Sequence, residues 1–134
     1  MTRTFLDSGV LIAAARGNDT VAQRALDIIK DRERVFVSSP FVRLEILPKA
    51  LFHRQDGEVI FYRSYFDLVR IWVDADRDLL EEAADVASRF GLAALDALHV
   101  TSAMIAGADE LVTTERPTRP IHRVSGLSVK TIYL

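Results

Sequence analysis

The sequence predicts a three-layer α/β domain built around a mainly parallel sheet. Short apolar or β-branched runs, typical of buried strands, alternate with longer segments whose apolar residues recur at helical spacing. The composition, with 49% hydrophobic and 27% charged residues, is that of a globular protein. A chain of 134 residues fits one domain of ordinary size, and we expect residues 1–134 to form it.

Strands and helices are expected in alternation along the chain. The strands are the short β-branched or apolar runs at residues 3–6, 35–39, 71–73, 110–114 and 128–134. The helices are the segments with helical periodicity: 9–16, from Asp19 or Thr20 to Ile29, from Pro40 through Glu45, 57–70, 76–91 and 92–108. The last of these is apolar almost all round, so we expect it to be buried in the middle of the fold.

Glycine and proline residues mark the expected helix ends. Gly17 and Asn18 end the first helix, and Gly91 ends the acidic helix 76–91. Pro40 suits the first turn of the third helix, whereas Pro48 is expected to kink that helix or end it early.

Charge and composition exclude several classes of protein. The formal net charge of -2 gives no overall basic character that would indicate a polyanion partner. The absence of cysteine removes disulfides, thiolate metal sites and cysteine nucleophiles. No apolar run approaches the ~20 residues of a membrane span, and Asp7 interrupts the only candidate signal segment. We therefore predict a cytoplasmic protein with no membrane partner.

Four acidic residues stand in apolar surroundings, unlike the other acidic residues of the chain. Asp7 ends the first strand and Glu115 follows the strand 110–114, while Glu45 and Asp96 lie on apolar helices. Each alone has an equally good structural explanation, because buried acids are usually paired or hydrogen-bonded. Two of them follow strands of a parallel sheet, whose carboxyl ends share one edge, and the two helices can pack beside that edge.

If these four carboxylates converge, their repulsion requires a cation. Mg²⁺ prefers a few carboxylates, waters and phosphate oxygens, and such a site suits phosphodiester hydrolysis by an in-line water attack. The pattern therefore predicts a metal-dependent hydrolase with Mg²⁺ or Mn²⁺ as the cofactor.

At these residues the chain resembles the PIN-domain family, and most closely its VapC-type toxin ribonucleases. The resemblance is carried by "FLDSGVLIAA", "SSPFVRLEI" and "LAALDALHVTSAMIAGADELVTTE", and it spans nearly the whole chain. It implies a PIN-like α/β/α fold in which Asp7, Glu45, Asp96 and Glu115 are the catalytic and metal-binding residues, with Ser8 and Thr113 supporting them. It also implies an RNA substrate, a homodimer and a small antitoxin that blocks the acidic cleft.

The sequence departs from the usual family pattern at two positions. Gly9 stands where the family usually has Asn after Asp-Thr or Asp-Ser, and Glu115 replaces the usual Asp. Because Glu is one methylene longer, we expect its ligation to run through water or to be weaker.

Further residues have competing interpretations. Candidates for an RNA phosphate-binding rim are Arg43, Lys49, Arg116 and Arg119. The aromatic residues between Phe61 and Trp72 could stack bases, but we favour packing in the core or at a subunit interface. His99, three residues after Asp96, could relay a proton, but we favour a hydrogen-bonded core histidine.

We predict a metal-dependent endoribonuclease, the toxin of a toxin–antitoxin pair. The alternative is a PIN-fold protein, catalytically degraded or acting alone, that serves as a nucleic-acid-binding or regulatory module. A phosphotransfer aspartate is disfavoured, because Gly9 stands where a phosphatase of that type needs a second acid and Lys130 is poorly placed for a receiver domain.

Overall fold

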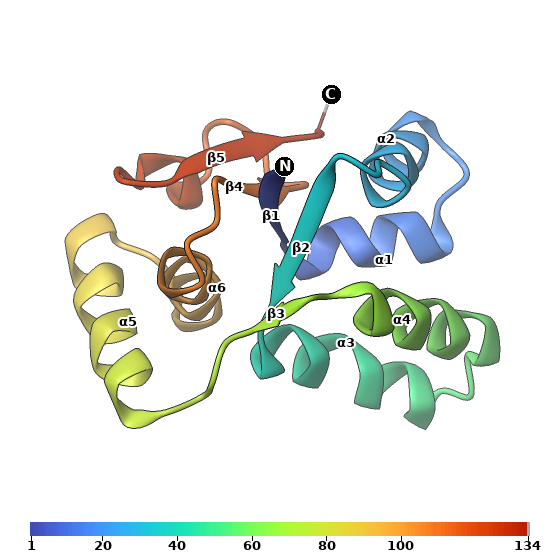
Figure 1. Ribbon diagram of the computed structural model, residues 1–134, viewed down its shortest axis with the longest axis horizontal. Coiled ribbons are helices and arrows are strands. Elements are labelled where there is room, and N and C mark those ends of the chain that lie inside the picture. The colour runs from blue at the N-terminus through green and yellow to red at the C-terminus, as the bar shows by residue number, and fades with distance from the viewer. Residues whose placement is uncertain (134) are drawn as a thin grey trace.

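In the computed structural model, which describes residues 1–133, five strands lie between two groups of helices (Figure 1). The strands are β1 (Thr2–Leu6), β2 (Arg34–Ser38), β3 (Ile71–Trp72), β4 (Glu110–Thr113) and β5 (Ser128–Thr131). The helices are α1 (Ser8–Arg16), α2 (Thr20–Ile29), α3 (Pro40–Phe52), α4 (Asp56–Leu68), α5 (Arg77–Phe90), α6 (Ala94–Ile105) and the 3₁₀ helix η1 (Pro120–Arg123). The predicted α/β fold class is confirmed.

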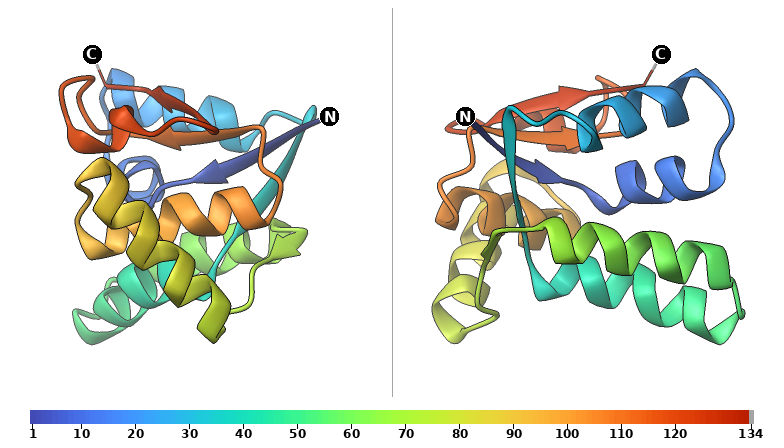
Figure 2. Two further views of the ribbon diagram at one scale, coloured as in Figure 1. Left: turned by 90° about the vertical axis from the view of Figure 1, so that its left-hand side faces the viewer. Right: turned by 45° about the vertical axis from the view of Figure 1, so that its right-hand side comes forward.

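The sheet is entirely parallel, with the strand order β3-β2-β1-β4-β5. The chain leaves the central strand β1 in one direction, through β2 to β3, and then returns to β4 on the other side of β1. Since parallel crossovers are right-handed, this reversal puts α1–α4 on one face and α5 and α6 on the other, as Figures 1 and 2 show. The reversal at β1 brings the carboxyl ends of β1 and β4 side by side, the position at which ligands bind in open parallel sheets.

Local sequence explains how the helices begin and end. Asp7, Asp19, Ser39 and Asp76 are the residues before α1, α2, α3 and α5, and each side chain accepts a hydrogen bond from a backbone N–H of the first turn. Gly91 ends α5 in the left-handed conformation with φ of 67°. The expected beginnings of these four helices are therefore confirmed to within about one residue.

The core lies between the central strands and the helices that cover them. Phe5, Val37 and Leu111 of β1, β2 and β4 are fully buried, and Val100 of α6 packs in the same cluster. Three of the aromatic residues considered for base stacking, Tyr62, Tyr65 and Phe66, are buried in this core, which confirms the packing interpretation for them. Trp72 is partly exposed. Within residues 1–133 no helix is both long and apolar enough to cross a membrane.

The expected early end of the third helix is wrong, because α3 continues past Pro48 to Phe52. Pro48 is exposed, whereas Ile46, Leu47 and Ala50 are buried. The packing of these apolar side chains outweighs the hydrogen bond that proline cannot donate. The ends of α4, α6 and β5 also fall a few residues inside the expected ranges, and the last residue of the expected final strand, Leu134, lies outside the described residues.

We predict that Pro48→Ala raises the free energy of unfolding by about 1–3 kcal/mol, because it restores a backbone donor inside a helix and removes a steric clash. Urea denaturation measures the change. Pro40→Ala is the matched control, since Pro40 occupies the first turn, where no helical donor is lost, and it should be close to neutral. A loss of stability in the Pro48→Ala variant would show that the proline is accommodated without cost.

Candidate functional site

Asp7 is a buried carboxylate at the end of the central strand. Its backbone N–H donates to Val112 O at 2.9 Å, which continues the β1–β4 ladder by one residue. One carboxylate oxygen, Oδ1, accepts from the N–H of Ser8 at 2.8 Å and so caps α1. The other, Oδ2, accepts from the hydroxyl of Thr113 at 2.9 Å. With only 7% of the residue exposed, this carboxylate is fixed by one amide and one hydroxyl.

Glu45 reaches the same region from α3. Its Oε1 accepts a hydrogen bond from the hydroxyl of Ser8 and lies 2.9 Å from Nε2 of His99. The same His99 Nε2 lies 3.9 Å from Oδ1 of Asp7. Ser8 and His99 therefore connect the two carboxylates, although they come from segments far apart in the sequence.

His99 is a residue whose importance the sequence understated. The favoured interpretation, a buried and hydrogen-bonded histidine, is confirmed, since the residue is 1% exposed. Its partner, however, is Glu45, which the sequence singled out for another reason. The available signal was the spacing of three residues from Asp96, which puts both side chains on the same side of α6.

Asp96 lies in the first turn of α6 and is electrostatically coupled to the other three acids. Burial raises the pKa of its carboxyl, and the charges of Asp7, Glu115 and Glu45 raise it further, while His99 opposes them. The other three carboxylates singled out in the sequence therefore all raise the pKa of this one group.

Glu115 follows β4 and is held by contacts within its own loop. Its backbone N–H donates to the hydroxyl of Thr113 at 3.1 Å, so that Thr113 connects this segment to Asp7. Its side chain accepts from Nε of Arg119 at 3.3 Å, and His122 Nε2 lies 3.1 Å from its carbonyl oxygen. Part of its charge is therefore already neutralised within its own loop.

The pKa shifts differ between Asp7 and Glu45 because their surroundings differ. Burial raises the pKa of Asp7 above its ordinary value, although His99, Thr113 and Ser8 oppose this. The hydrogen bond from His99 lowers the pKa of Glu45, helped by Ser8 and Lys49 and opposed by burial. The neighbours of Glu45 stabilise its ionised form. The neighbours of Asp7 do not offset the effect of burial on its ionised form.

The donor set fits a hard divalent cation in its chemistry, because it consists of carboxylate oxygens whose ionised forms repel one another. Within residues 1–133 no three His, Asp or Glu side chains stand close enough together to hold an ion as they lie. Glu45 is turned toward His99 and Ser8, so joining a metal site requires its carboxylate to be shared or reoriented. The metal-binding role of the four acids stays a prediction.

The four residues proposed for a phosphate-binding rim lie in different settings. Arg116 and Arg119 line a pocket of about 390 Å³ together with Glu115, and Arg116 lies over the ring of Tyr133 at 5.0 Å. Lys49 lines a separate pocket beside α1, and Arg43 lies 5.9 Å from the ring of Phe66. Arg116 and Arg119 therefore share a pocket with the candidate carboxylate Glu115, whereas Lys49 acts on Glu45 through its charge.

Glu110 is a buried acid that the sequence did not single out. It begins β4, is 2% exposed, and accepts from the hydroxyl of Thr4 at 2.7 Å. Lys130 Nζ lies 3.0 Å and an Arg34 guanidinium nitrogen 3.3 Å from its carboxylate. Burial opposes ionisation, but these three partners together hold the pKa of Glu110 below its ordinary value. This acid is fully compensated and serves the packing of the sheet.

Gly9 is explained by the close approach of Thr114. A Cβ atom built on Gly9 would overlap the hydroxyl of Thr114, whose own Cβ would lie at 3.6 Å. The space that a side chain at position 9 needs is therefore already filled from the loop after β4. Thr114 stands between Thr113 and Glu115, so this contact fixes the segment that carries both.

We predict that Gly9→Ala lowers the free energy of unfolding by about 1 kcal/mol, because the added methyl overlaps a stiff β-branched side chain. In a Thr114→Ala background the same substitution should instead stabilise by about 0.5–1 kcal/mol, since alanine favours a helix more than glycine does. A double-mutant cycle by urea denaturation measures the coupling. An equal effect of Gly9→Ala in both backgrounds would show that Thr114 does not restrict position 9.

Comparisons with known proteins agree with this fold. The family model described as "PIN domain" matches residues 4–118. A comparison with curated protein sequences finds no match. Among solved structures, VapBC2 from Rickettsia felis, bound to a DNA fragment from its promoter, has a TM-score of 0.73 at 12% identity and covers 97% of this chain and 98% of its own.

Two further structures are similar over nearly the same length. A toxin–antitoxin complex from Klebsiella pneumoniae has a TM-score of 0.72 at 19% identity, with 97% of this chain and 98% of that chain covered. DNA-bound VapBC from Salmonella typhimurium has a TM-score of 0.69 at 15% identity, with 98% and 99% covered. At these identities the likeness concerns the fold, whereas the family model covers most of the sequence. The chain belongs to the PIN-domain family.

Proposed function

We propose that the protein is a metal-dependent endoribonuclease that hydrolyses RNA phosphodiester bonds. The observation that carries this proposal is the buried carboxylate of Asp7 at the end of β1, which Ser8 and His99 connect to Glu45. Within residues 1–133 the chargeable group paired with Asp7 is His99, at 3.9 Å, and burial still raises the pKa of Asp7. A buried carboxylate with so little compensation is suited to receive a cation.

Each side chain has a distinct role in this proposal. Asp7, Glu45 and Asp96 would hold Mg²⁺ or Mn²⁺, and Glu115 would orient water or assist a second ion. When bound, the cation supplies the positive charge that activates water and stabilises the phosphate undergoing attack. Ser8 and Thr113 hold the carboxylates in place through the contacts described above. His99 is a positioning residue that fixes Glu45.

The RNA chain would be bound by basic side chains outside the carboxylates. Arg116 and Arg119 border the pocket next to Glu115, and Lys49 acts on Glu45 from α3. Arg43 is the fourth candidate. Such contacts bind phosphates without reading sequence, so they account for affinity and not for the choice of cleavage site.

We propose further that the protein acts in the cytoplasm as a homodimeric toxin paired with a small antitoxin. The similarity to VapBC complexes supports this assignment. A second support is a set of exposed apolar side chains on α3 and α4: Leu44, Leu51, Phe52 and Ile60. A surface of this kind is typical of proteins that bury it against a partner.

The nuclease proposal predicts that purified protein cleaves RNA with Mg²⁺ or Mn²⁺, and that Asp7→Asn or Asp96→Asn lowers the rate by on the order of 100-fold or more. Cleavage of a broad RNA pool, followed by end mapping, measures it. Asp67→Asn on α4 is the matched control, because this acid is exposed and outside the cluster, and its activity should equal that of the wild type.

Equal cleavage by the wild type and the Asp7→Asn variant with both metals would contradict the nuclease proposal. That result would favour the alternative of a PIN-fold protein that binds nucleic acid or regulates without catalysis.

A second prediction tests the carboxylates without measuring activity. Because the pKa of Asp7 is raised, the protonated form fits the fold better than the ionised form. Protonated Asp7 therefore stabilises the folded state fully below the pKa of an unfolded Asp, and this contribution is lost as the pH rises through the raised pKa of the folded state. At pH 7 the metal-free Asp7→Asn variant should therefore be more stable than the wild type and melt at a higher Tm.

Two further readouts make this prediction specific. The difference in Tm should shrink as the pH is lowered from 7 toward the ordinary Asp value of 3.8. Mn²⁺ should raise the Tm of the wild type and leave that of the Asp7→Asn variant unchanged, since only the former binds the ion. Equal stabilisation of both proteins by Mn²⁺ would remove Asp7 from the metal site.

A further inference from the structure

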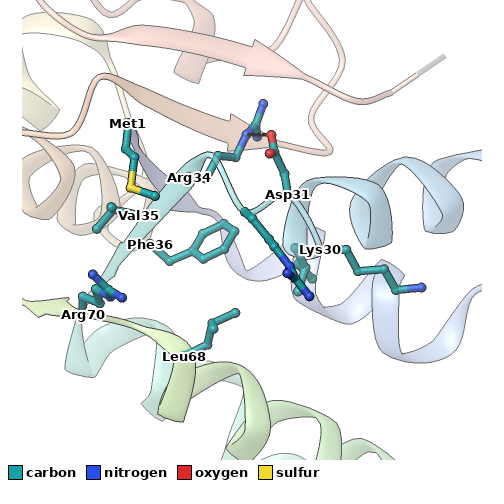
Figure 3. A pocket seen from close by; sticks show the side chains of 10 residues that line it. Met1, Lys30, Asp31, Arg34, Val35, Phe36, Leu68 and Arg70 are labelled. Atoms are coloured by element: carbon teal, nitrogen blue, oxygen red, sulfur yellow. Dashed lines mark hydrogen bonds and ion pairs between the residues drawn. The ribbon is translucent and has the colours of Figure 1, made fainter.

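Another pocket opens at the amino end of β2, at the opposite edge of the sheet from the carboxylates. It exists because β3 is short and pairs only with Val37 and Ser38, which leaves the first residues of β2 without a neighbouring strand on that side. The pocket has a volume of about 400 Å³ and lies between the end of α2, β2 and the end of α4 (Figure 3). A cavity of this size fits a small molecule.

The pocket carries an excess of positive charge in a protein whose net charge is -2. Four basic residues line it, Lys30, Arg32, Arg34 and Arg70, with a single acid, Asp31. Asp31 is already bound to Arg34, whose Nε lies 3.1 Å from its carboxylate, and a second guanidinium nitrogen of Arg34 lies 3.3 Å from buried Glu110. The carboxylate of Asp31 is therefore neutralised by Arg34.

Two other guanidinium groups are left for a ligand. Arg32 and Arg70 are exposed, and within residues 1–133 neither forms an ion pair with a carboxylate. Arg32 belongs to the loop between α2 and β2, and Arg70 directly precedes β3. The backbone N–H of Arg70 donates to Phe36 O at 3.1 Å, which fixes the base of this side chain against β2. Planar guanidinium groups bind phosphate through paired hydrogen bonds.

The remaining lining is apolar. Figure 3 shows Phe36 in the middle of the pocket, with Leu68 below it and Arg70 to one side, while the Arg34–Asp31 pair closes the top. Val35 and Met1 complete the apolar wall. A ligand that satisfies both parts of the pocket carries a phosphate group for the arginines and an apolar ring for the wall.

We propose that this pocket binds a nucleotide, with Arg32 and Arg70 holding its phosphates and the apolar wall contacting its base. The site is separate from the carboxylate cluster and does not depend on the proposed nuclease activity. A long RNA strand is a poorer fit, because the pocket has the volume of a small-molecule site, about 400 Å³.

Isothermal titration calorimetry in EDTA buffer with ATP tests the proposal, since EDTA removes any binding through divalent cations at the carboxylates. The Arg32→Ala/Arg70→Ala variant should bind ATP about 10-fold or more weakly, because two charge-assisted contacts are lost. Arg24→Ala/Arg63→Ala is the matched control: both arginines are exposed on α2 and α4 outside the pocket, so the variant has the same charge change and should bind like the wild type.

Two additional measurements separate the contribution of the phosphates from that of the base, and show that any loss of binding does not come from unfolding. Adenosine and inorganic tripolyphosphate should each bind more weakly than ATP, since each satisfies only one part of the pocket. Arg70→Glu, with thermal melting checked beside it, should abolish ATP binding while the protein stays folded. The Asp7→Asn variant should bind ATP like the wild type, whatever the outcome of the cleavage assay.

Three results would overturn the proposal. The first is equal ATP affinity in the wild type and the Arg32→Ala/Arg70→Ala variant. The second is an equal loss in the Arg24→Ala/Arg63→Ala control, which would reduce the effect to overall charge. The third is a single-stranded RNA oligonucleotide whose binding requires Arg32 and Arg70 while ATP binding does not, which would assign the pocket to RNA.

Discussion

The burial of the Asp7 carboxylate at the end of the central strand is the constraint on which the candidate site depends. Its two oxygens take hydrogen bonds from α1 and from β4, and its charge is felt by Asp96 on α6. Through Ser8 and His99 the same group is connected to Glu45 on α3. Four segments are therefore arranged around one carboxylate, and the parallel sheet makes this possible because it brings the carboxyl ends of β1 and β4 together.

Glu110 shows what a purely structural buried acid looks like in the same sheet. Thr4 and Glu110 are paired across β1 and β4, so Glu110 sits only a few residues from Asp7 along the ladder. Lys130, Arg34 and Thr4 surround its carboxylate and lower its pKa, whereas the partners of Asp7 leave its pKa raised. The difference between the two acids is the physical reason to assign Asp7 to binding a cation and Glu110 to holding the strands together.

The sequence allowed the strands and the beginnings of most helices to be predicted, because each depends on a local pattern, whereas the metal-binding role of the four acids stays a prediction. What it did not disclose depends on contacts between distant segments. His99 gains its importance only when α6 is packed beside α3, and Glu110 is explained only by basic residues on β2 and β5. Pro48 was misjudged for a related reason, since the apolar side chains around it keep α3 intact beyond the proline.

Gly9 shows how a departure from the usual family pattern is balanced within the fold. With a side chain at position 9, Thr114 could not lie against the first turn of α1. Its neighbours Thr113 and Glu115 are connected by a hydrogen bond, and Thr113 is in turn bound to Asp7. The absence of a side chain at position 9 therefore lets the loop that carries Thr113 and Glu115 lie closer to α1. The two departures at positions 9 and 115 therefore act on the same segment, because Thr114, which contacts position 9, lies between Thr113 and Glu115.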